Sequence, residues 1–172
     1  MLIKLKGNKF DAFYQLMQDS FPPDEYRPYH HQRALLDNPF YQIYMYEEHD
    51  ELVAFFATWQ SQEFIFLEHF AVQASFRNGG LGTKLLQAFL QQSKQSVIIE
   101  IEPPTNGDLE KRRAKFYERN GFSLSKWGYI QPALAKGYDP VPLVLMAYPQ
   151  PLSFASYLEF KGWVFQHVYK NE

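Results

Sequence analysis

Three glycines stand close together in the stretch Arg77-Asn78-Gly79-Gly80-Leu81-Gly82-Thr83, between an apolar run and an amphipathic run. Glycines in such a turn let the backbone approach a ligand closely. The amino end of a helix that follows presents N–H groups without helical partners to an anion. This segment is therefore a candidate phosphate-binding turn.

Three phosphate-binding signatures compete for a turn of this kind. A Walker loop requires G-x-x-x-x-G-K-[ST], but here Thr83 precedes Lys84. A dinucleotide fingerprint requires G-x-G-x-x-G, but Leu85 occupies the position of its third glycine. The third signature, an Arg followed by x-x-G-x-G, is the one that the sequence matches. Because the lysine of a Walker loop is missing, a nucleotide-binding protein is disfavoured. The other interpretation is a glycine turn that only packs a helix against a strand.

The elements around the turn follow from hydrophobic periodicity. Phe64–Val72 is apolar except for Glu68 and His69, which is typical of a central strand covered on both faces. Leu81–Gln95 has an apolar stripe at helical spacing. The sequence therefore predicts a strand, a loop and a helix in order over Phe64–Gln95.

The remaining elements predict an α+β domain. Before the turn we expect a strand over Leu2–Leu5, a helix over Lys9–Asp19 capped by Asn8, a helix over Tyr29–Leu36, and a hairpin of Tyr41–Glu47 with Leu52–Gln60. After it we expect a strand over Val97–Ile101, a helix over Asp108–Arg119 ended by Asn120-Gly121, and strands over Phe122–Ile130 and Leu143–Tyr148. The tail Ser153–Tyr169 fits a helix or a strand. The prediction is one domain over 1–172, with 151–172 as a C-terminal extension and a mixed, mostly antiparallel central sheet flanked by helices.

Composition excludes several classes of function. The 172 residues contain no cysteine and carry a net charge of −2, so we expect no thiolate chemistry, no disulfides and no nucleic-acid partner. The five histidines show no metal-ligand spacing, and we expect no metal. With no apolar run long enough for a signal peptide or a membrane span, a cytoplasmic protein without a membrane partner is expected.

Two segments of the sequence also resemble motifs of a known protein family. Phe70-Ala71-Val72 followed by Phe76–Thr83 looks like the pyrophosphate-binding motif of the GNAT superfamily of N-acetyltransferases, and Phe116–Phe122 looks like the Y-x-x-x-G-F helix end of that family. The two motifs occur in the family's order. The resemblance spans roughly Leu2 to Tyr148 and implies a GNAT-like fold.

The resemblance implies acetyl-CoA as co-substrate. Main-chain groups of Phe70, Ala71 and Val72 would pair with the pantetheine arm as an added strand does. The pyrophosphate would lie against the amides of Arg77, Asn78, Gly79, Gly80, Leu81, Gly82 and Thr83. The sequence departs from the family at Glu110–Arg113, where many members carry an asparagine near the CoA arm. The basic residues of this helix could approach a CoA phosphate or form a solvated face.

Acyl transfer to an amine requires a proton acceptor for the amine and a proton donor for the departing thiolate. Glu68 is the predicted acceptor, with a pKa raised by apolar neighbours; a structural carboxylate paired with an arginine is the alternative. His69 is the second candidate, although a regular strand would place it on the opposite face. By resemblance, Tyr117 is the predicted proton donor, and a packing tyrosine is the alternative.

The loop Phe21–Arg27 corresponds to the region that usually shapes the acceptor pocket in the family. Glu25 and Arg27 could bind an ammonium or a carboxylate there, and a solvated loop is the other interpretation. The predicted function is transfer of acetyl from acetyl-CoA to a small-molecule amine or a protein amino group, by direct attack in a ternary complex. A homodimer is possible. A non-catalytic acyl-CoA-binding or regulatory domain is the alternative function.

Overall fold

The computed structural model describes residues 1–169. Its contacts divide the chain into two compact units. The first contains Met1–Gln60 and Leu67–Gln92, and the second contains Ser61–Phe66 and the chain from Ser93 onward. Strand β4 (Phe64–Val72) begins in the second unit and ends in the first.

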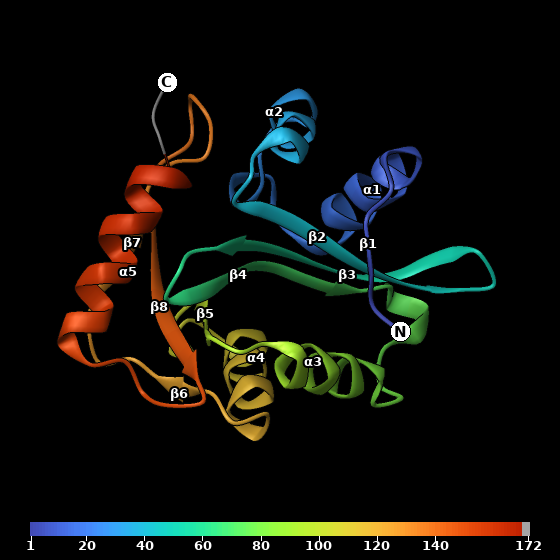
Figure 1. Ribbon diagram of the computed structural model, residues 1–172. Helices are drawn as coiled ribbons and strands as arrows, with labels where there is room; N and C mark the ends of the chain where they lie inside the picture. Colours follow the sequence, from blue (N-terminus) through green and yellow to red (C-terminus); the bar gives the residue numbers. More distant parts are fainter. Residues whose placement is uncertain (170–172) are drawn as a thin grey trace. The chain divides into compact units, whose positions relative to one another are not determined.

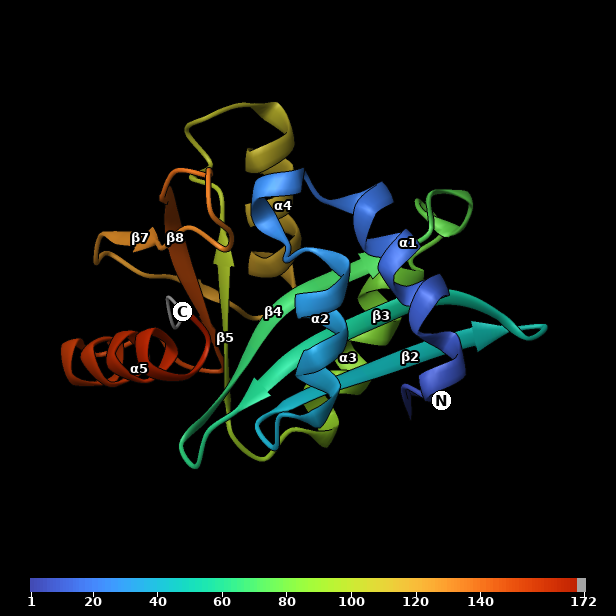
Figure 2. The same ribbon diagram turned by 90° about the horizontal axis from the view of Figure 1, so that it is seen from above.

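The first unit is a sheet with helices on both faces (Figure 1). Its strand order is β1-β2-β3-β4. Helices α1 and α2 cover one face and α3 covers the other, and the view from above shows α1 and α2 crossing in front of β2 and β3 (Figure 2). Besides β4, the elements are β1 (Ile3–Lys4), α1 (Phe10–Ser20), α2 (Tyr29–Ala34), β2 (Tyr41–Glu48), β3 (Glu51–Gln60) and α3 (Leu81–Gln92), with 3-10 turns at Gly7–Lys9, Pro23–Glu25, Leu35–Asp37 and Ala74–Phe76.

Successive side chains of a strand point in opposite directions, so β3 packs against helices on both faces of the sheet. Phe55 contacts Phe13 of α1, with ring centroids 4.7 Å apart. The next residue, Phe56, stacks on Phe70 of β4 at 4.3 Å and on Phe89 of α3 at 4.9 Å. Aromatic rings therefore form part of the core on both faces of this sheet.

The hairpin between β2 and β3 has a two-residue loop, and its two antiparallel strands pair from Tyr41 with Trp59 to Glu48 with Glu51. Both loop residues, His49 and Asp50, have positive φ angles of 49° and 64°. Two consecutive left-handed residues match the twist that paired strands require. The Glu48–Glu51 break in periodicity is therefore a tight turn, as the sequence predicts.

The second unit also has helices on both sides of its strands. Its strand order is β4-β5-β8-β6, with β7 paired to β8. Phe160 of α5 packs against Phe64 and Phe66 of β4, at 5.2 and 5.4 Å between centroids. The elements are β5 (Ser96–Ile101), α4 (Asp108–Arg119), β6 (Ser123–Leu124), β7 (Tyr129–Gln131), β8 (Val141–Tyr148) and α5 (Phe154–His167).

The predicted fold class, a mixed α+β domain with a mostly antiparallel sheet, is confirmed. The bounds of β4 and α4 agree with the sequence prediction. The single domain over 1–172 stays a prediction, and residues 170–172 of the predicted extension lie outside the described residues.

Three local predictions are wrong. Asn8 does not cap α1, because Gly7–Lys9 forms a 3-10 turn and the helix begins at Phe10 without a side-chain cap. Helix α3 ends at Gln92 rather than Gln95. The strand predicted over Phe122–Ile130 is two short strands, β6 and β7, separated by four residues.

The ambiguous tail is a helix. Ser153 is its N-cap, and the Ser153 hydroxyl accepts a hydrogen bond from the Ser156 amide at 3.1 Å. An N-cap of this type satisfies an amide that has no partner within the helix. Tyr157, Phe160 and Val164 are its buried residues, and Phe160 is the one that contacts β4.

Candidate active site

The glycine-rich segment forms an open turn at the amino end of α3. Asn78 and Gly80 both adopt left-handed backbone angles, with φ of 67° and 79°. A Cβ added at Gly79 or Gly80 would meet no atom within 4 Å, so this side of the turn is open. The first helical hydrogen bond runs from the Lys84 amide to the Gly80 carbonyl at 3.1 Å. The amides between these residues have no partner within the helix, which is the arrangement that binds anions.

The end of β4 is tied to this turn by Arg77. Its Nε donates a hydrogen bond to the main-chain carbonyl of Val72 at 2.8 Å. Of the main-chain groups predicted to pair with pantetheine, the Val72 carbonyl therefore already has a donor. The Phe70 ring stacks on Phe56, and Ala71 is buried. The pairing of Phe70, Ala71 and Val72 with a cofactor stays a prediction.

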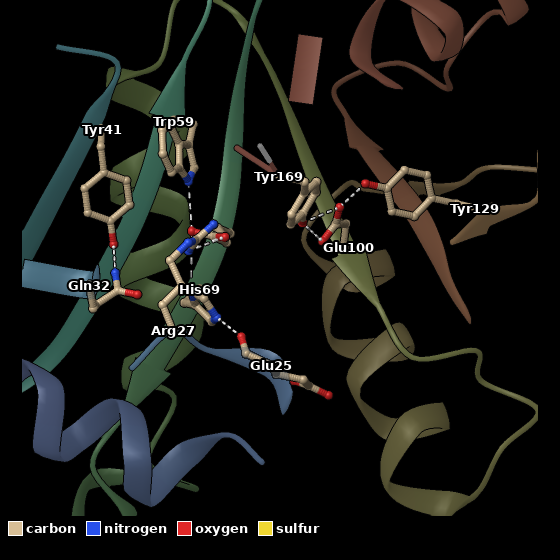
Figure 3. A network of polar contacts seen from close by, with 10 residues as sticks. Glu25, Arg27, Gln32, Tyr41, Trp59, His69, Glu100, Tyr129 and Tyr169 are labelled. Carbon is tan, nitrogen blue, oxygen red and sulfur yellow. Dashed lines mark hydrogen bonds and ion pairs between the residues drawn. The ribbon is translucent and has the colours of Figure 1, made fainter. Parts of the chain in front are cut away.

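Glu68 lies in a buried ion pair with Arg27. Glu68 Oε1 is 2.9 Å from an Arg27 guanidinium nitrogen, and the two side chains are 4% and 8% exposed. The indole of Trp59 on β3 donates a hydrogen bond to Oε2 at 2.8 Å (Figure 3). The Arg27 guanidinium also lies over the Trp59 ring, 5.7 Å from its centroid. Both carboxylate oxygens thus have protein partners.

The predicted rise in the pKa of Glu68 is wrong. Burial alone would raise that pKa, but the positive charge of Arg27 opposes it, together with His69 and the hydrogen bond from Trp59. The net effect holds the pKa of Glu68 below its ordinary value of 4.5. Glu68 is therefore an ionised carboxylate at neutral pH.

His69 joins the same cluster, although a regular strand would turn it to the other face. Its Nε2 lies 2.7 Å from the main-chain oxygen of Glu25, and its Nδ1 lies 3.8 Å from Glu68 Oε2. The ring also contacts Phe21 edge to face, at 4.8 Å between centroids. Burial lowers the pKa of His69, and the nearby carboxylate of Glu68 only partly offsets this. The ring is neutral at neutral pH.

The structure brings the two predicted acceptor-binding residues against β4. Glu25 supplies the carbonyl that holds His69, and Arg27 supplies the cation that holds Glu68. The Arg27 carbonyl in turn accepts a hydrogen bond from Tyr14 of α1 at 3.1 Å. The loop between α1 and α2 is thus fixed to the strand by polar contacts on both residues. That Glu25 and Arg27 bind an acceptor stays a prediction.

Three further residues of this cluster were not predicted from the sequence, namely Gln32, Tyr41 and Trp59. Gln32 of α2 donates a hydrogen bond to the Tyr41 hydroxyl at 2.7 Å, and the Tyr41 ring contacts Trp59 at 4.9 Å between centroids (Figure 3). Burial and then the charge of Glu68 raise the pKa of Tyr41 well above its ordinary value. The alternation of β3 places Trp59 on the α1 face with Phe55. Trp59 could therefore have been predicted from this sequence pattern.

Tyr117 lies in the second unit, near the end of α4. Its buried ring contacts Phe116 and Phe122, at 5.2 and 5.3 Å between centroids. Burial raises the pKa of Tyr117 to about 12, and Arg113 partly opposes this. The predicted C-cap is confirmed: Gly121 has a φ of 92°, and the Phe122 amide donates to the Tyr117 carbonyl at 3.1 Å. Tyr117 is therefore packed against two aromatic rings, and its raised pKa keeps the phenol protonated at neutral pH.

The basic face of α4 is largely solvated. Lys111, Arg112, Lys115 and Arg119 are exposed, whereas Arg113 is 3.1 Å from a carboxylate oxygen of Glu102. The second unit also contains a carboxylate that the sequence analysis missed. Glu100 of β5 accepts hydrogen bonds from Tyr129 and from Tyr169, the latter at 2.9 and 2.6 Å (Figure 3). It ties the chain that follows α5 to β5.

Several solved structures with the same fold are named as acetyltransferases. A Bacteroides thetaiotaomicron protein assigned to the GNAT family is 28% identical, with a TM-score of 0.91 over 100% of this chain and 99% of that one. The Escherichia coli ribosomal-protein-S18-alanine N-acetyltransferase is 18% identical, with a TM-score of 0.64 over 89% and 95% of the two chains. An aminoglycoside 6'-N-acetyltransferase in complex with coenzyme A is 18% identical, with a TM-score of 0.63 over 89% and 99%. The last two show the likeness of fold alone.

The family model of the acetyltransferase (GNAT) family matches residues 10–122, so the chain belongs to this family. The predicted resemblance is confirmed, and with it the class of enzyme, an N-acetyltransferase that carries out acyl transfer. Acetyltransferases of this family use acetyl-CoA. No curated protein sequence matches the chain. Within residues 1–169, no helix is long and apolar enough to span a bilayer, and no cluster of three or more histidine or carboxylate side chains could hold a metal.

Proposed function

We propose that this chain transfers the acetyl group of acetyl-CoA to a primary amine, by direct attack of the amine within a ternary complex. The observation that carries the proposal is the open turn at the start of α3, where Gly79 and Gly80 leave room beside amides that have no helical partner. That geometry fits a pyrophosphate, which the backbone can bind closely. Acetyl-CoA supplies the thioester that the amine attacks.

The residues that would bind acetyl-CoA belong to the first unit. The main chain of Phe70–Val72 is the proposed partner of the pantetheine arm, and the amides of Arg77–Thr83 are the proposed partners of the pyrophosphate. Tyr117 is the proposed donor of the proton that the thiolate needs. Its pKa of about 12 keeps the phenol protonated at neutral pH, which supports this role.

The group that takes the proton from the amine is proposed to be one of two neighbours on β4, Glu68 or His69. Both are 4% exposed, and their side chains meet in one cluster. Glu25 and Arg27 contact these two residues, which supports the proposal that this loop shapes the acceptor side of the site. A small-molecule amine or a protein amino group is the proposed acceptor. Among structures of this fold are a spermidine N-acetyltransferase and enzymes named for aminoglycosides and for a ribosomal protein.

The test is a thiol-release screen with acetyl-CoA over a panel of amines, including polyamines, aminoglycosides and peptides with free amino termini. The proposal expects thiol release that depends on at least one amine. Acetyl-CoA should also raise the melting temperature, because binding to the folded state alone stabilises it by about 2.7 kcal/mol at a hundredfold excess over Kd. A melting shift without thiol release would support the non-catalytic binding domain and overturn this proposal.

A further inference from the structure

The two nitrogens of the His69 ring have different environments. Nε2 lies 2.7 Å from the Glu25 carbonyl oxygen. A carbonyl oxygen can only accept a hydrogen bond, so the proton of the neutral ring must be on Nε2. Nδ1 then carries a lone pair and acts as a base. A main-chain carbonyl thus fixes the tautomer of this histidine.

The lone pair on Nδ1 has no donor. The atom is buried, and among residues 1–169 nothing forms a hydrogen bond with it. Glu68 Oε2 lies 3.8 Å away, but a carboxylate oxygen is another acceptor. A buried acceptor without a donor is uncommon and costs stability, and such atoms are often explained by a ligand or a catalytic role. The missing partner is a group that carries an N–H or O–H.

Glu68 is a poorer candidate for proton transfer because its oxygens are occupied. Oε1 pairs with Arg27 and Oε2 accepts the indole N–H of Trp59. A carboxylate held by a cation gains a proton less readily than a free one. The same negative charge next to His69 stabilises an imidazolium, however, so Glu68 can assist a neighbour that takes the proton.

We propose that Nδ1 of His69 receives the proton of the acceptor amine, with Glu68, Arg27 and the Glu25 carbonyl as the groups that position the ring. This inference rests on the proposed function and deepens it. The amine nitrogen forms a bond to the thioester carbonyl carbon, and the carbon–sulfur bond breaks. The acceptor starts as an ammonium, and one of its protons passes to Nδ1 before the nitrogen attacks. The nitrogen then loses a second proton to water, and the CoA thiolate takes the phenolic proton of Tyr117, which water replaces. The products are therefore an amide and a thiol, with one net proton left on His69.

The charged groups around His69 set how its proton affinity responds to mutation. Glu68 on β4 raises the pKa of His69, while Arg27 from the loop before α2 lowers it. From the other elements, Phe21 contacts the ring and does not titrate, and Glu25 supplies the carbonyl that binds Nε2 and also carries a carboxylate on its side chain. Of these groups, the Glu68 and Arg27 charges and the Glu25 carbonyl are the ones that shift the pKa of His69. Replacing Glu68 should therefore lower the pKa of His69. Because the base must be neutral to work, the acidic limb of the kcat/KM profile should then move to lower pH.

The decisive variant is His69→Gln. The glutamine amide can still donate to the Glu25 carbonyl but has no basic nitrogen. We expect kcat to fall by about 10²–10⁴, while the melting shift with acetyl-CoA is kept. Activity should recover as the pH approaches the amine pKa of about 10.4, where the free base is present in solution. His31→Gln, on the exposed side of α2, is the matched control and should keep the parental kinetics.

Two further measurements test the proposal independently: the tautomer of His69 and the pH profile of Glu68→Gln. In nitrogen-15 NMR of the unaltered protein, His69 should be the Nε2–H tautomer, and in Glu68→Gln the acidic limb should shift as stated. A His69→Gln variant with parental kcat at every pH, or an Nδ1–H tautomer in the parent, overturns the inference. If the parent releases no thiol with any amine, the proposed function fails instead, and the tautomer measurement still tests the ring geometry.

Discussion

We expect the buried ion pair between Arg27 and Glu68 to respond differently to replacement of one partner and of both. Removing one partner of a buried pair leaves an uncompensated charge, which typically costs about 3–5 kcal/mol of unfolding free energy. Both side chains here are less than a tenth exposed, at 8% and 4%. We therefore expect Glu68→Gln to lower the free energy of unfolding by about 3–5 kcal/mol, as measured by urea denaturation.

The double variant Glu68→Gln with Arg27→Met provides the control. It removes both charges together and retains most of the buried volume. Replacing a buried pair by uncharged residues is often neutral or stabilising, so the double variant should be more stable than Glu68→Gln alone. Equal losses in the two variants would contradict the buried-pair interpretation.

Tyr117 can be tested by removing only its hydroxyl. Tyr117→Phe keeps the ring contacts with Phe116 and Phe122, so the melting temperature should change little. If the phenol protonates the thiolate, kcat should fall by about 10²-fold. With a pKa of about 12, Tyr117 should add no limb to the parental pH–rate profile at neutral or mildly alkaline pH. An unchanged kcat would leave Tyr117 with a packing role alone.

At the level of single residues, the sequence indicated which side chains gather at β4 better than it indicated what surrounds each of them. Glu68, His69, Glu25 and Arg27 were all singled out, and the structure brings them together. The pKa of Glu68 was predicted in the wrong direction, because the apolar neighbours on its own strand were visible and its partner from a distant loop was not. Local periodicity gives no information about which segments converge in space, and for this reason Gln32, Tyr41 and Glu100 were also missed.

The turn before α3 offers an unusually clean test of phosphate binding. Gly79 has no left-handed φ, and a Cβ there would meet no atom within 4 Å, so Gly79→Ala should fold and bind normally. Gly79→Asp adds a negative charge beside the proposed pyrophosphate position. We expect it to abolish the melting shift with acetyl-CoA, as measured by differential scanning fluorimetry. An equal shift in the Ala and Asp variants would mean that the phosphate site lies elsewhere. Gly80 is less suitable, because its φ of 79° would strain any side chain.

Elements with strong periodicity were predicted closely, and those with weak periodicity were not. Strand β4 and helix α4 match their predicted bounds because each has clear breaks at its ends. The stretch after Phe122 is apolar enough to suggest one strand. Its pairing with β8 is interrupted after Ser125, whose amide still donates to the Leu145 carbonyl at 2.8 Å, and resumes at β7. The tail could not be decided because the apolar residues of α5 are not confined to one face: Phe154, Leu158 and Phe165 are exposed, while Tyr157, Phe160 and Val164 are buried.

For the molecule as a whole, the cluster at β4 predicts loss of stability in acid in two steps. Stability rises with pH wherever the unfolded chain binds more protons than the folded one. The pKa of His69 lies below its ordinary 6.5 in the folded protein, so stability should begin to fall as the pH drops below about 6.5. The pKa of Glu68 is also lowered, so its contribution is present above about 4.5 and is lost as the pH falls further.

Thermal melting across this pH range separates the two groups. In His69→Gln the near-neutral decline should be absent, while the decline below about 4.5 remains. The exposed-site variant His31→Gln should follow the parent throughout. A parental curve for His69→Gln would show that His69 has the same pKa in the folded and unfolded chains.

The contact between Trp59 and Glu68 gives the first unit an optical reporter. The chain has three tryptophans, and the other two, Trp127 and Trp163, belong to the second unit. The Trp59 indole donates to a carboxylate and lies under a guanidinium, so its emission depends on the electric field within the cluster. In a protein with phenylalanine at the other two positions, fluorescence would report directly on an amine that enters beside His69, without turnover and without an added label.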